Sequence, residues 1–481
     1  MIHDLKPYPA YKDSGVPWLG KVPEHWEVLP NRALFEEVKE RDCPDEQLLS
    51  VTISQGVIQQ TDLLTNSSKK DSSNEDKTKY KLVKPGDIAY NKMRAWQGAV
   101  GVSKYRGIVS PAYVVVHPRD TQNPSYFHYL LRTPAFAKEA ERWSYGITSD
   151  QWSLRPEHFK MIYCSLPPKE EQSAIVRYLD HIDRRIRHYI RAKKKLIKLL
   201  EEQKQAIIHQ AVTRGLDPNV KLKPSGIEWL EEIPEHWEVL PLKALSTVQS
   251  GITLGKQYLG QKLVEFPYLR VANVQEGHVN LSEIKTIEVP AEEAKRSRLQ
   301  KGDVLMTEGG DPDKLGRGCV WEGQVSPCLH QNHIFAVRPN INRLRPYYLG
   351  ILLSSQYSKE YFLRTGKQTT NLASTNKTTI GQFPIPLPKV EEQDLILDKV
   401  ENELEGIERA MSGISREISI LREYRTRLIA DVVTGKLDVR EAAANLSDKS
   451  DEIEVEDDFE EETIEESLEE IVTEEIVEGE L

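Results

Sequence analysis

One octapeptide, Pro-Glu-His-Trp-Glu-Val-Leu-Pro, occurs twice without a change in this 481-residue chain, at residues 23–30 and 234–241. The residues just before it repeat as well: Ser14, Gly15, Trp18 and Leu19 match Ser225, Gly226, Trp229 and Leu230. The offset of 211 residues is far longer than the repeat of a solenoid or propeller, which is about 20 to 50 residues. The chain is therefore an internal duplication, in which each copy is a domain with its connector.

A second set of matches shows how each copy is built. Glu171-Gln172 matches Glu392-Gln393, and Val212-Thr213 matches Val433-Thr434, at an offset of 221 residues. Because the offset has grown by ten residues, insertions must lie in the middle of a copy, between shared ends. The interiors agree only loosely, as where Lys84-Pro85-Gly86-Asp87 resembles Gln300-Lys301-Gly302-Asp303. A protein that carries one module twice usually meets a target with two halves.

The end of each copy has the spacing of a long helix. Apolar residues recur from Ile175 at alternating steps of four and three, which is a heptad pattern. Pro167-Pro168 precedes the pattern and Gly215 follows it, as expected at helix ends. A helix from Glu170 to Thr213 would be about 65 Å long. This is too long for the interior of one small domain, so the helix needs a partner.

The same stripe of apolar residues returns 221 residues later, so the chain supplies that partner. We predict that the two helices pack together through these seam residues: Ile175, Leu179, Ile182, Ile186, Leu196, Leu200, Ile207, Ile396, Val400, Ile407, Ile414, Leu421 and Leu428. Lys193 and Gln203 are expected as polar interruptions of the first stripe. The alternative is two amphipathic helices that each pack only on their own domain. Burial of each Leu or Ile contributes about 1.5 to 3 kcal/mol, which favours pairing.

The sequence before each helix indicates mixed α/β structure. Runs with strand composition lie at residues 113–116, 268–271 and 334–337, and helical patches lie near 124–132 and 346–354. Two globular domains, over about 20–168 and 234–388, are each large enough to bury a core.

Cysteine usage and hydropathy predict the compartment. Cys43, Cys164, Cys319 and Cys328 are scattered, which favours a reduced interior over a disulfide framework. No signal-peptide core opens the chain and no apolar run approaches membrane-spanning length. We therefore expect a soluble, cytoplasmic protein.

The acidity of the chain is concentrated at its C-terminus. The formal net charge is −11, but residues 445–481 hold 18 Asp or Glu against Lys449 alone. Residues 1–444 therefore carry +6. The C-terminal segment is expected to be a disordered acidic tail. One interpretation is a tail that only keeps the protein soluble. The other is a DNA mimic that folds back over the basic faces, which deletion of 445–481 would test by a change in DNA affinity.

The repeated motifs resemble a known family. The segments 18–28 and 229–239, the Leu-Pro-Pro-Lys-Glu-Glu-Gln run at 166–172 and the two-domain, two-helix duplication look like the DNA specificity subunit of type I restriction-modification systems. The resemblance implies an α+β fold with two pseudo-symmetric mixed α/β target-recognition domains and two helices packed as an antiparallel coiled coil. The implied segments are a first domain (1–168), a spacer helix (169–214), a linker (215–233), a second domain (234–388), a C-terminal helix (389–440) and the tail (441–481).

The resemblance also implies function and partners. Each domain would read one half of a bipartite double-stranded DNA sequence, and this chain would have no cofactor of its own. Two modification subunits would bring S-adenosylmethionine and methylate adenine, and restriction subunits would bring ATP and Mg. An antiparallel helix pair relates the copies by a pseudo-twofold axis, which matches two inverted half-sites, and its length would set their spacing.

Polar, turn-prone loops are the candidates for DNA contact, because cations, amides and planar side chains suit phosphate and base-edge binding. In the first domain they are residues 91–98 and 145–152, and in the second 308–318, 330–333 and 367–371. The candidate residues are Lys92, Arg94, Trp96, Gln97, Tyr145, Thr148, Ser149, Gln151, Asp311, Lys314, Arg317, Gln331, Asn332, His333, Lys367, Thr369 and Asn371.

Two motifs invite other readings. Asn123-Pro124-Ser125-Tyr126 is one residue from the motif with which amino-methyltransferases hold a base, but Asn as helix N-cap and Pro at the first helical position explain it better. Cys319, Cys328, His330 and His333 have poor spacing for zinc, and no phosphate-binding Gly-x-x-x-x-Gly-Lys-Ser/Thr loop is present. We expect no catalytic residue and no metal.

Two alternatives to the reader function are a nucleic-acid-modifying enzyme with an unrecognised site and a coiled-coil scaffold without a DNA role. The segments around Trp18, Trp26, Trp229 and Trp237 are shared by both copies. They could bind two identical modification subunits or pack internally against the helix pair.

Overall fold

The computed structural model describes residues 5–61, 77–119, 122–146, 152–310, 315–368 and 373–446. The described residues form two units, which we call unit 1 (within 1–194 and 416–481) and unit 2 (195–415). Two long helices, α6 (Lys169–Arg214) and α11 (Val390–Val433), each begin in one unit and end in the other.

Both units contain the same core sheet, which confirms the duplication. In unit 1 four antiparallel strands lie in the order β4 (Phe35–Val38), β11 (Tyr113–Pro118), β8 (Ile88–Asn91) and β9 (Val100–Val102). In unit 2 the order is β16 (Ser246–Ser250), β23 (Ile334–Pro339), β19 (Val304–Thr307) and β21 (Gly318–Val320). The offset rises from 211 residues between the starts of β4 and β16 to 221 between β11 and β23. The insertions therefore lie between the core strands, as predicted.

The elements around the core sheet also occur in pairs. Those of unit 1 are β1 (Tyr11–Asp13) with β2 (Lys21–Pro23), β3 (Glu27–Pro30) with β12 (Tyr163–Leu166), α1 (Asn31–Leu34), α3 (Pro124–Leu131), α4 (Pro134–Arg142) and α5 (Pro156–Phe159). Those of unit 2 are β13 (Leu222–Ile227) with β14 (Leu230–Pro234), β15 (Glu238–Pro241) with β26 (Pro384–Leu387), η3 (Leu242–Ala244), α8 (Pro346–Ser354), α9 (Gln356–Thr365) and α10 (Lys377–Gln382).

The remaining described elements surround the shared ones. Unit 1 adds β5 (Leu49–Thr52) with β6 (Gly56–Gln59), β7 (Lys81–Val83) with β10 (Gly107–Val109), η1 (Ala95–Gln97) and α12 (Arg440–Ala444). Unit 2 adds a sheet of β18 (Lys285–Pro290), β17 (Leu263–Leu269) and β22 (Leu329–His330), with η4 (Val271–Asn273) and α7 (Ala291–Arg296). It also holds β20 (Gly309–Gly310), β25 (Ala373–Ser374) and β24 (Lys367–Gln368). The strand expected at 268–271 is therefore displaced, because Leu269 ends β17 and a 3-10 turn follows.

The repeated Gly-Asp turn introduces the same core strand in each unit. Gly86 and Gly302 have φ of 91° and 89°, a left-handed conformation that glycine adopts without a steric penalty. The carboxylates of Asp87 and Asp303 accept the backbone N–H of residues 84 and 300, each at 2.8 Å. This buried carboxylate fixes the turn that leads into β8 or β19.

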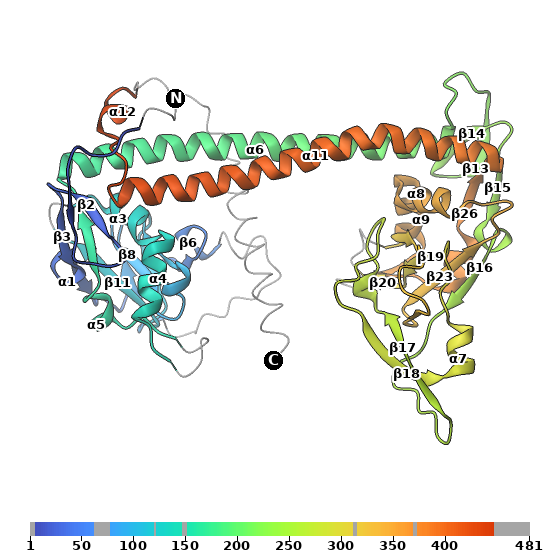
Figure 1. Cartoon of the computed structure of the whole chain (residues 1–481), viewed down its shortest axis with the longest axis horizontal. Helices are drawn as coiled ribbons and strands as arrows, with labels where there is room; N and C mark the ends of the chain where they lie inside the picture. Colours follow the sequence, from blue (N-terminus) through green and yellow to red (C-terminus); the bar gives the residue numbers. More distant parts are fainter. Residues whose placement is uncertain are drawn as a thin grey trace. The chain divides into compact units, whose positions relative to one another are not determined.

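The two long helices lie side by side and antiparallel (Figure 1). Asp183 pairs with Arg425 and Lys193 with Glu417 in unit 1, and Lys204 pairs with Glu408 at 2.8 Å in unit 2. As the residue numbers on α6 rise, those of their partners on α11 fall, so the prediction of an antiparallel pair is confirmed. Among the described residues, no helix has the length and apolar content to cross a membrane.

Most of the expected seam residues are buried, but the register differs in the middle of α6. Ile175, Leu179, Ile186, Ile396, Val400, Ile407 and Leu428 are buried, and Ile182, Leu200, Ile207, Ile414 and Leu421 are half-buried. Leu196 is 44% exposed, whereas Ile190 is 5% exposed. Gln203 is exposed, and Lys204 is the second polar interruption instead. The reason is a pair of consecutive four-residue steps, 175–179–183, after which every second seam position lies one residue later than predicted, at 183, 190, 197 and 204, while 186, 193, 200 and 207 keep their places.

The repeated octapeptide packs against the start of a long helix in each unit. In unit 1, Glu171 near the start of α6 accepts hydrogen bonds from Trp26 Nε1 at 3.0 Å and Tyr8 Oη at 2.5 Å, and His25 Nε2 lies 2.7 Å away. In unit 2, Glu392 near the start of α11 accepts Trp237 Nε1 at 3.0 Å, with His236 Nε2 at 2.9 Å. This pairing explains why His-Trp and the later Glu recur together.

The same octapeptide receives the end of the other long helix. Gly435 follows α11 with φ 78°, and a Cβ there would lie 2.3 Å from Pro23 and 3.1 Å from Trp26. Gly215 follows α6 with φ 73°, and a Cβ there would lie 3.2 Å from Trp237. Each unit therefore joins the start of one long helix to the end of the other. Trp26 and Trp237 are 0% exposed, so these two rings pack internally.

The buried Asp183 is expected to hold α6 against α11 at the unit 1 end. Asp183 is 5% exposed and pairs with Arg425 and Arg187. Burial alone would raise the pKa of this carboxyl, but the two guanidinium groups keep the pKa below its usual value. Asp183→Leu should lower the free energy of unfolding by about 1.5 to 3 kcal/mol, because two cations lose a charged hydrogen-bond partner. Urea unfolding measures the change.

The second copy offers the matched control for this prediction. The residue equivalent to Asp183 is Leu404, which is 9% exposed, so an apolar residue fits this seam position. The double variant Asp183→Leu/Arg425→Leu should recover most of the lost stability, since an apolar pair can replace an ion pair at little cost. Equal losses in the single and double variants would contradict this account.

Candidate nucleic-acid interface

The candidate loops of unit 1 meet at the end of β8. After this strand, Asn91 Oδ1 accepts the backbone N–H of Met93 at 3.0 Å, and Trp96 Nε1 donates to Met93 O at 2.8 Å. Gly98, with φ 100°, ends the 3-10 turn. The segment 91–98 is thus a tight turn that presents Lys92, Arg94, Trp96 and Gln97 at the edge of the core sheet.

The second polar loop of unit 1 packs on this turn. Leu154 donates its backbone N–H to Lys92 O at 2.9 Å, and Tyr145 pairs with Ser153. The rings of Trp96 and Trp152 meet edge to face, with centroids 5.4 Å apart. The structure therefore brings the two predicted loops together. Thr148, Ser149 and Gln151 lie outside the described residues.

Lys81 lies within electrostatic reach of three other cations, and only one of them, Lys92, belongs to a predicted loop. Burial and the positive charges of Lys92, Arg41 and Lys39 lower the pKa of Lys81, while the nearby Glu37 carboxylate raises it. Lys39 and Arg41 are exposed on the segment after β4. Glu37, whose carboxylate lies 3.9 Å from Lys39 Nζ, balances only part of this charge, and a net positive group attracts a DNA phosphate. The signal in the sequence was only Lys39-Glu40-Arg41, which is common on surfaces.

The candidate loops of unit 2 meet at the equivalent place, the end of β19. Glu308, the next residue, donates its backbone N–H to His333 O at 2.8 Å, and its carboxylate lies 2.5 Å from His333 Nδ1. β20, β25 and β24 form one small sheet that joins Gly309–Gly310 to Lys367–Gln368. All three predicted stretches of unit 2 therefore converge.

Other candidates of unit 2 lie around this small sheet. Gln331 and Asn332 are half-buried, because their backbone N–H groups donate to Leu269 O and Ile252 O, each at 2.9 Å. Arg317 is half-buried, and its Nε has no hydrogen-bond partner among the described residues. Lys367 is exposed. Asp311, Lys314, Thr369 and Asn371 lie outside the described residues.

The residues considered for zinc binding and for methyl transfer have structural roles. His330 is 0% exposed, its Nδ1 lies 2.9 Å from Ile334 O, and burial lowers its pKa to about 4. Within the described ranges, no three His, Cys, Asp or Glu side chains form a group that could hold a metal ion. Asn123 caps α3 by accepting the backbone N–H of Ser125, and Tyr126 is 0% exposed. The N-cap interpretation of this motif is confirmed.

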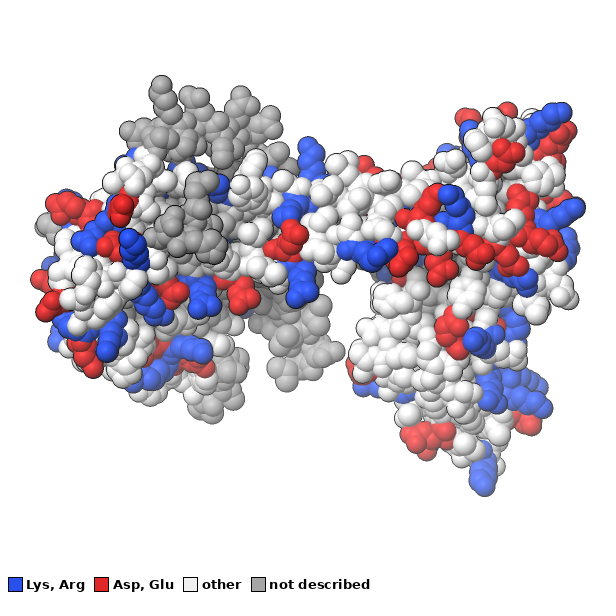
Figure 2. Space-filling view, turned by 45° about the horizontal axis from the view of Figure 1, so that its top comes forward, with Lys and Arg blue, Asp and Glu red and all other residues white. Residues whose placement is uncertain are grey.

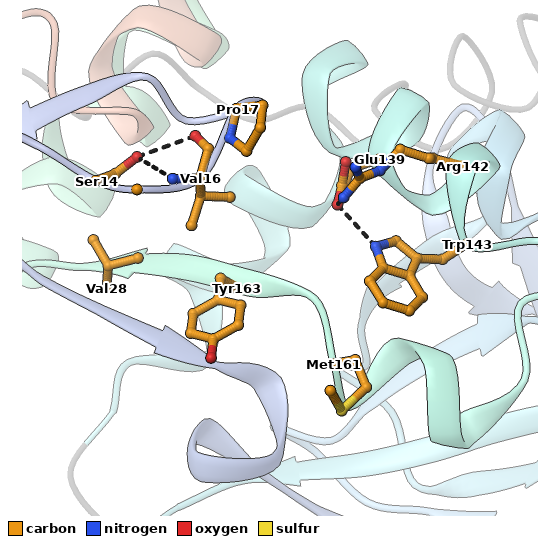
Figure 3. Close-up of a pocket in the computed structure, with 10 residues that line it drawn as sticks. Ser14, Val16, Pro17, Val28, Glu139, Arg142, Trp143, Met161 and Tyr163 are labelled. Carbon is orange, nitrogen blue, oxygen red and sulfur yellow. Dashed lines mark hydrogen bonds and ion pairs between the residues drawn. The ribbon is translucent and has the colours of Figure 1, made fainter.

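Unit 1 also holds a pocket of 540 Å³ (Figure 3). Residues 14–17 form one wall, and Val28, Trp143, Met161 and Tyr163 line the rest. Its two charged residues, Glu139 and Arg142, pair with each other at 2.6 Å. The guanidinium at this pocket is therefore already paired with a carboxylate, which does not favour a phosphate there.

Charges of both signs are mixed on the face of the molecule that Figure 2 shows, where Lys and Arg are interspersed with Asp and Glu.

Comparison with known proteins identifies relatives of both units. The model of the type I restriction modification DNA specificity domain matches residues 23–199 and 234–413. The chain is 21% identical over 456 residues to the EcoKI specificity subunit of Escherichia coli K12, which covers 89% of this chain and 92% of that protein. It is 29% identical over 205 residues to a Methanocaldococcus jannaschii protein named as the MjaX specificity subunit, over 42% of this chain and 47% of that protein.

A solved structure has the same fold. It comes from work on complex assembly and conformational transition of the type I R-M system, and the alignment covers 86% of this chain and 99% of that chain. The TM-score is 0.63 at 16% sequence identity, so this likeness concerns the fold alone.

Proposed function

The chain belongs to the type I restriction modification DNA specificity family, and on that premise we propose that it reads a bipartite DNA sequence, with one half-site for each unit. The observation that carries this proposal is the equivalence of β8 and β19. The same core strand ends in each unit at a convergence of polar loops, and those loops differ between the copies. An identical frame with different contact residues suits two different half-sites.

The chemistry of the loops supports DNA contact. Arg317 is a half-buried cation on one of these loops, and Arg is the commonest bidentate ligand of guanine in the major groove. The cations near Lys81 in unit 1 suit phosphates, which position a protein without reading sequence. Trp96 and Trp152 add planar surface beside them.

This chain is proposed to be the non-catalytic reader of a larger, cytoplasmic complex. Two modification subunits would supply S-adenosylmethionine and adenine methylation, and restriction subunits would supply ATP- and Mg-dependent cleavage. Its four cysteines are free, and three of them are buried, which suits a reducing compartment.

A methylation assay tests the division of labour. The purified chain with S-adenosylmethionine and mixed duplex DNA should transfer no methyl group, and addition of the cognate modification subunit should start transfer at a defined sequence. Transfer by the chain alone would replace the reader function with that of an enzyme.

Arg317 and Arg41 should show two different kinds of DNA contact. Arg317→Ala should cost about 1 to 3 kcal/mol of binding and relax specificity in one half-site only, because a base contact is lost. Arg41→Ala should weaken binding to all DNA sequences alike. It should also reduce the slope of log affinity against log salt concentration by about 1, as loss of a phosphate contact does. Fluorescence anisotropy with variant half-sites at several salt concentrations measures both. A uniform loss for Arg317→Ala would remove it from the base-reading set.

A further inference from the structure

A row of basic residues runs along one face of α6. Arg177, His181, Arg184, His188 and Arg191 follow one another at steps of four and three, so they share one face of the helix. We call these five residues the α6 basic stripe. All of them belong to unit 1.

The stripe faces away from the helix pairing. One residue turns the helix by about 100°, which places the stripe about 180° around α6 from the seam residues Ile175, Leu179, Ile186 and Ile190. Arg187, which pairs with Asp183, and Lys193, which pairs with Glu417, are not members of the stripe. The stripe therefore lies on the face of α6 opposite to the apolar seam.

The sequence around the stripe concentrates positive charge beyond what a solvated helix face needs. From Arg184 to Leu200 the chain holds eight Lys or Arg and no Asp or Glu. Like charges at helical spacing destabilise a helix, so such a run is favoured when an anion lies along it. The carboxylate of Asp180, which lies just before His181 in the sequence, is already engaged, because it accepts a hydrogen bond from Tyr129 at 2.5 Å.

The chain leaves the described region at the stripe. Leu446 is the last described residue, and its carbonyl accepts a hydrogen bond from Arg177 at 2.7 Å. The 35 residues that follow, 447–481, hold 18 Asp or Glu and one Lys. An acidic segment is thus tethered to the first residue of a basic stripe.

We infer that the acidic segment 447–481 docks on the α6 basic stripe of its own chain. The stripe from Arg177 to Arg191 is about 21 Å long, and fewer than ten residues of extended chain cover that distance. A short tether gives an effective concentration of about millimolar, so weak ion pairs suffice for occupancy. Asp448 is the first acid after Leu446, and Asp451, Glu452, Glu454 and Glu456 follow it within about the length of chain that covers the stripe.

Docking has a consequence for DNA, which rests on the proposed function. The covered stripe cannot bind phosphates, so the segment lowers affinity for DNA of any sequence while the loops at β8 and β19 stay available. Nonspecific binding comes almost wholly from phosphate contacts, and the segment therefore raises the ratio of specific to nonspecific binding.

Zero-length carbodiimide cross-linking with mass spectrometry tests the docking without reference to DNA. The full-length variant Arg184→Lys/Arg191→Lys keeps the charge of the stripe and adds amines that can couple to carboxylates. Cross-links from residues 447–481 should concentrate at positions 184 and 191, at least fivefold over the exposed Lys12 and Lys138 of unit 1, and should fall in 1 M salt. The contact between Lys193 and Glu417 is the internal control for the folded helix pair. Even cross-linking over all exposed lysines, with that control intact, would overturn the docking.

Charge-matched variants test the consequence. Asp451→Asn/Glu452→Gln/Glu454→Gln/Glu456→Gln should raise affinity for random duplex DNA at least tenfold at 0.1 M salt. The control variant changes the net charge by the same amount, because it removes four exposed acids from α11 instead: Asp398→Asn, Glu401→Gln, Glu405→Gln and Glu423→Gln. The gain should disappear when Arg184→Gln/Arg191→Gln is added. If the gain in DNA affinity persists without these two arginines, the acidic segment acts on another face and the inference is wrong. A lack of any DNA binding would instead contradict the proposed function, and the cross-links would still test the docking.

Discussion

A seven-residue insertion in both long helices should lengthen the unspecified spacer of the recognised sequence by about three base pairs and leave both half-sites unchanged. Seven helical residues add about 10.5 Å, and one base pair spans about 3.4 Å. α6 and α11 are continuous and pair along their length through contacts such as Lys193 with Glu417 and Lys204 with Glu408. Both helices must therefore be extended at matched points, after Lys198 and after Ser412. Methylome sequencing reads the new spacer.

An insertion in α6 alone is the control. It would place Lys204 and the seam residues after it opposite the wrong residues of α11, so loss of assembly is expected and not a new spacer. A full double insertion that methylates the original spacer would contradict the idea that the helices set the distance.

Trp26→Ala should cost about 3 to 5 kcal/mol of unfolding free energy, as truncation of a buried large aromatic side chain does. Trp26 is 0% exposed, packs against Tyr8 at 5.7 Å between centroids, and donates to Glu171. Its loss leaves a cavity and removes a hydrogen bond from a carboxylate that is 5% exposed. Trp237→Ala should have a similar effect on unit 2, because Trp237 donates to Glu392 in the same way.

Trp96→Ala is the matched control for these variants. Trp96 is half-buried and contacts Trp152 at the loop edge, so its truncation should change thermal unfolding little and DNA binding more. Calorimetry of the three variants separates the two roles. Equal unfolding temperatures for Trp26→Ala and Trp96→Ala would contradict the structural role of the octapeptide.

The duplication and the helix pair were predictable because their signals are strong and local. The two identical octapeptides show that the chain is duplicated, and proline and glycine mark the helix ends. The seam register was harder. The steps 175–179–183 place Asp183, a charged residue, at a buried position, and a search for apolar spacing passes over such a residue.

The binding loops were predictable as loops and not as contacts. Strand ends and turn residues pointed to 91–98 and 308–318, but only the fold shows that Leu154 donates to Lys92 O and that Glu308 meets His333. These partners are 62 and 25 residues apart in the sequence, and no spacing rule connects them. The role of Glu171 was hidden for the same reason, since its partner Trp26 lies 145 residues earlier.

Methylome sequencing of cells that express this chain with its cognate modification subunit, compared with cells lacking the chain, tests the reader function most directly. The account predicts one new bipartite methyladenine motif with an unspecified spacer, and the Arg317→Ala variant should relax one half of that motif only. Absence of any new motif, with the complex shown to be assembled, would contradict it.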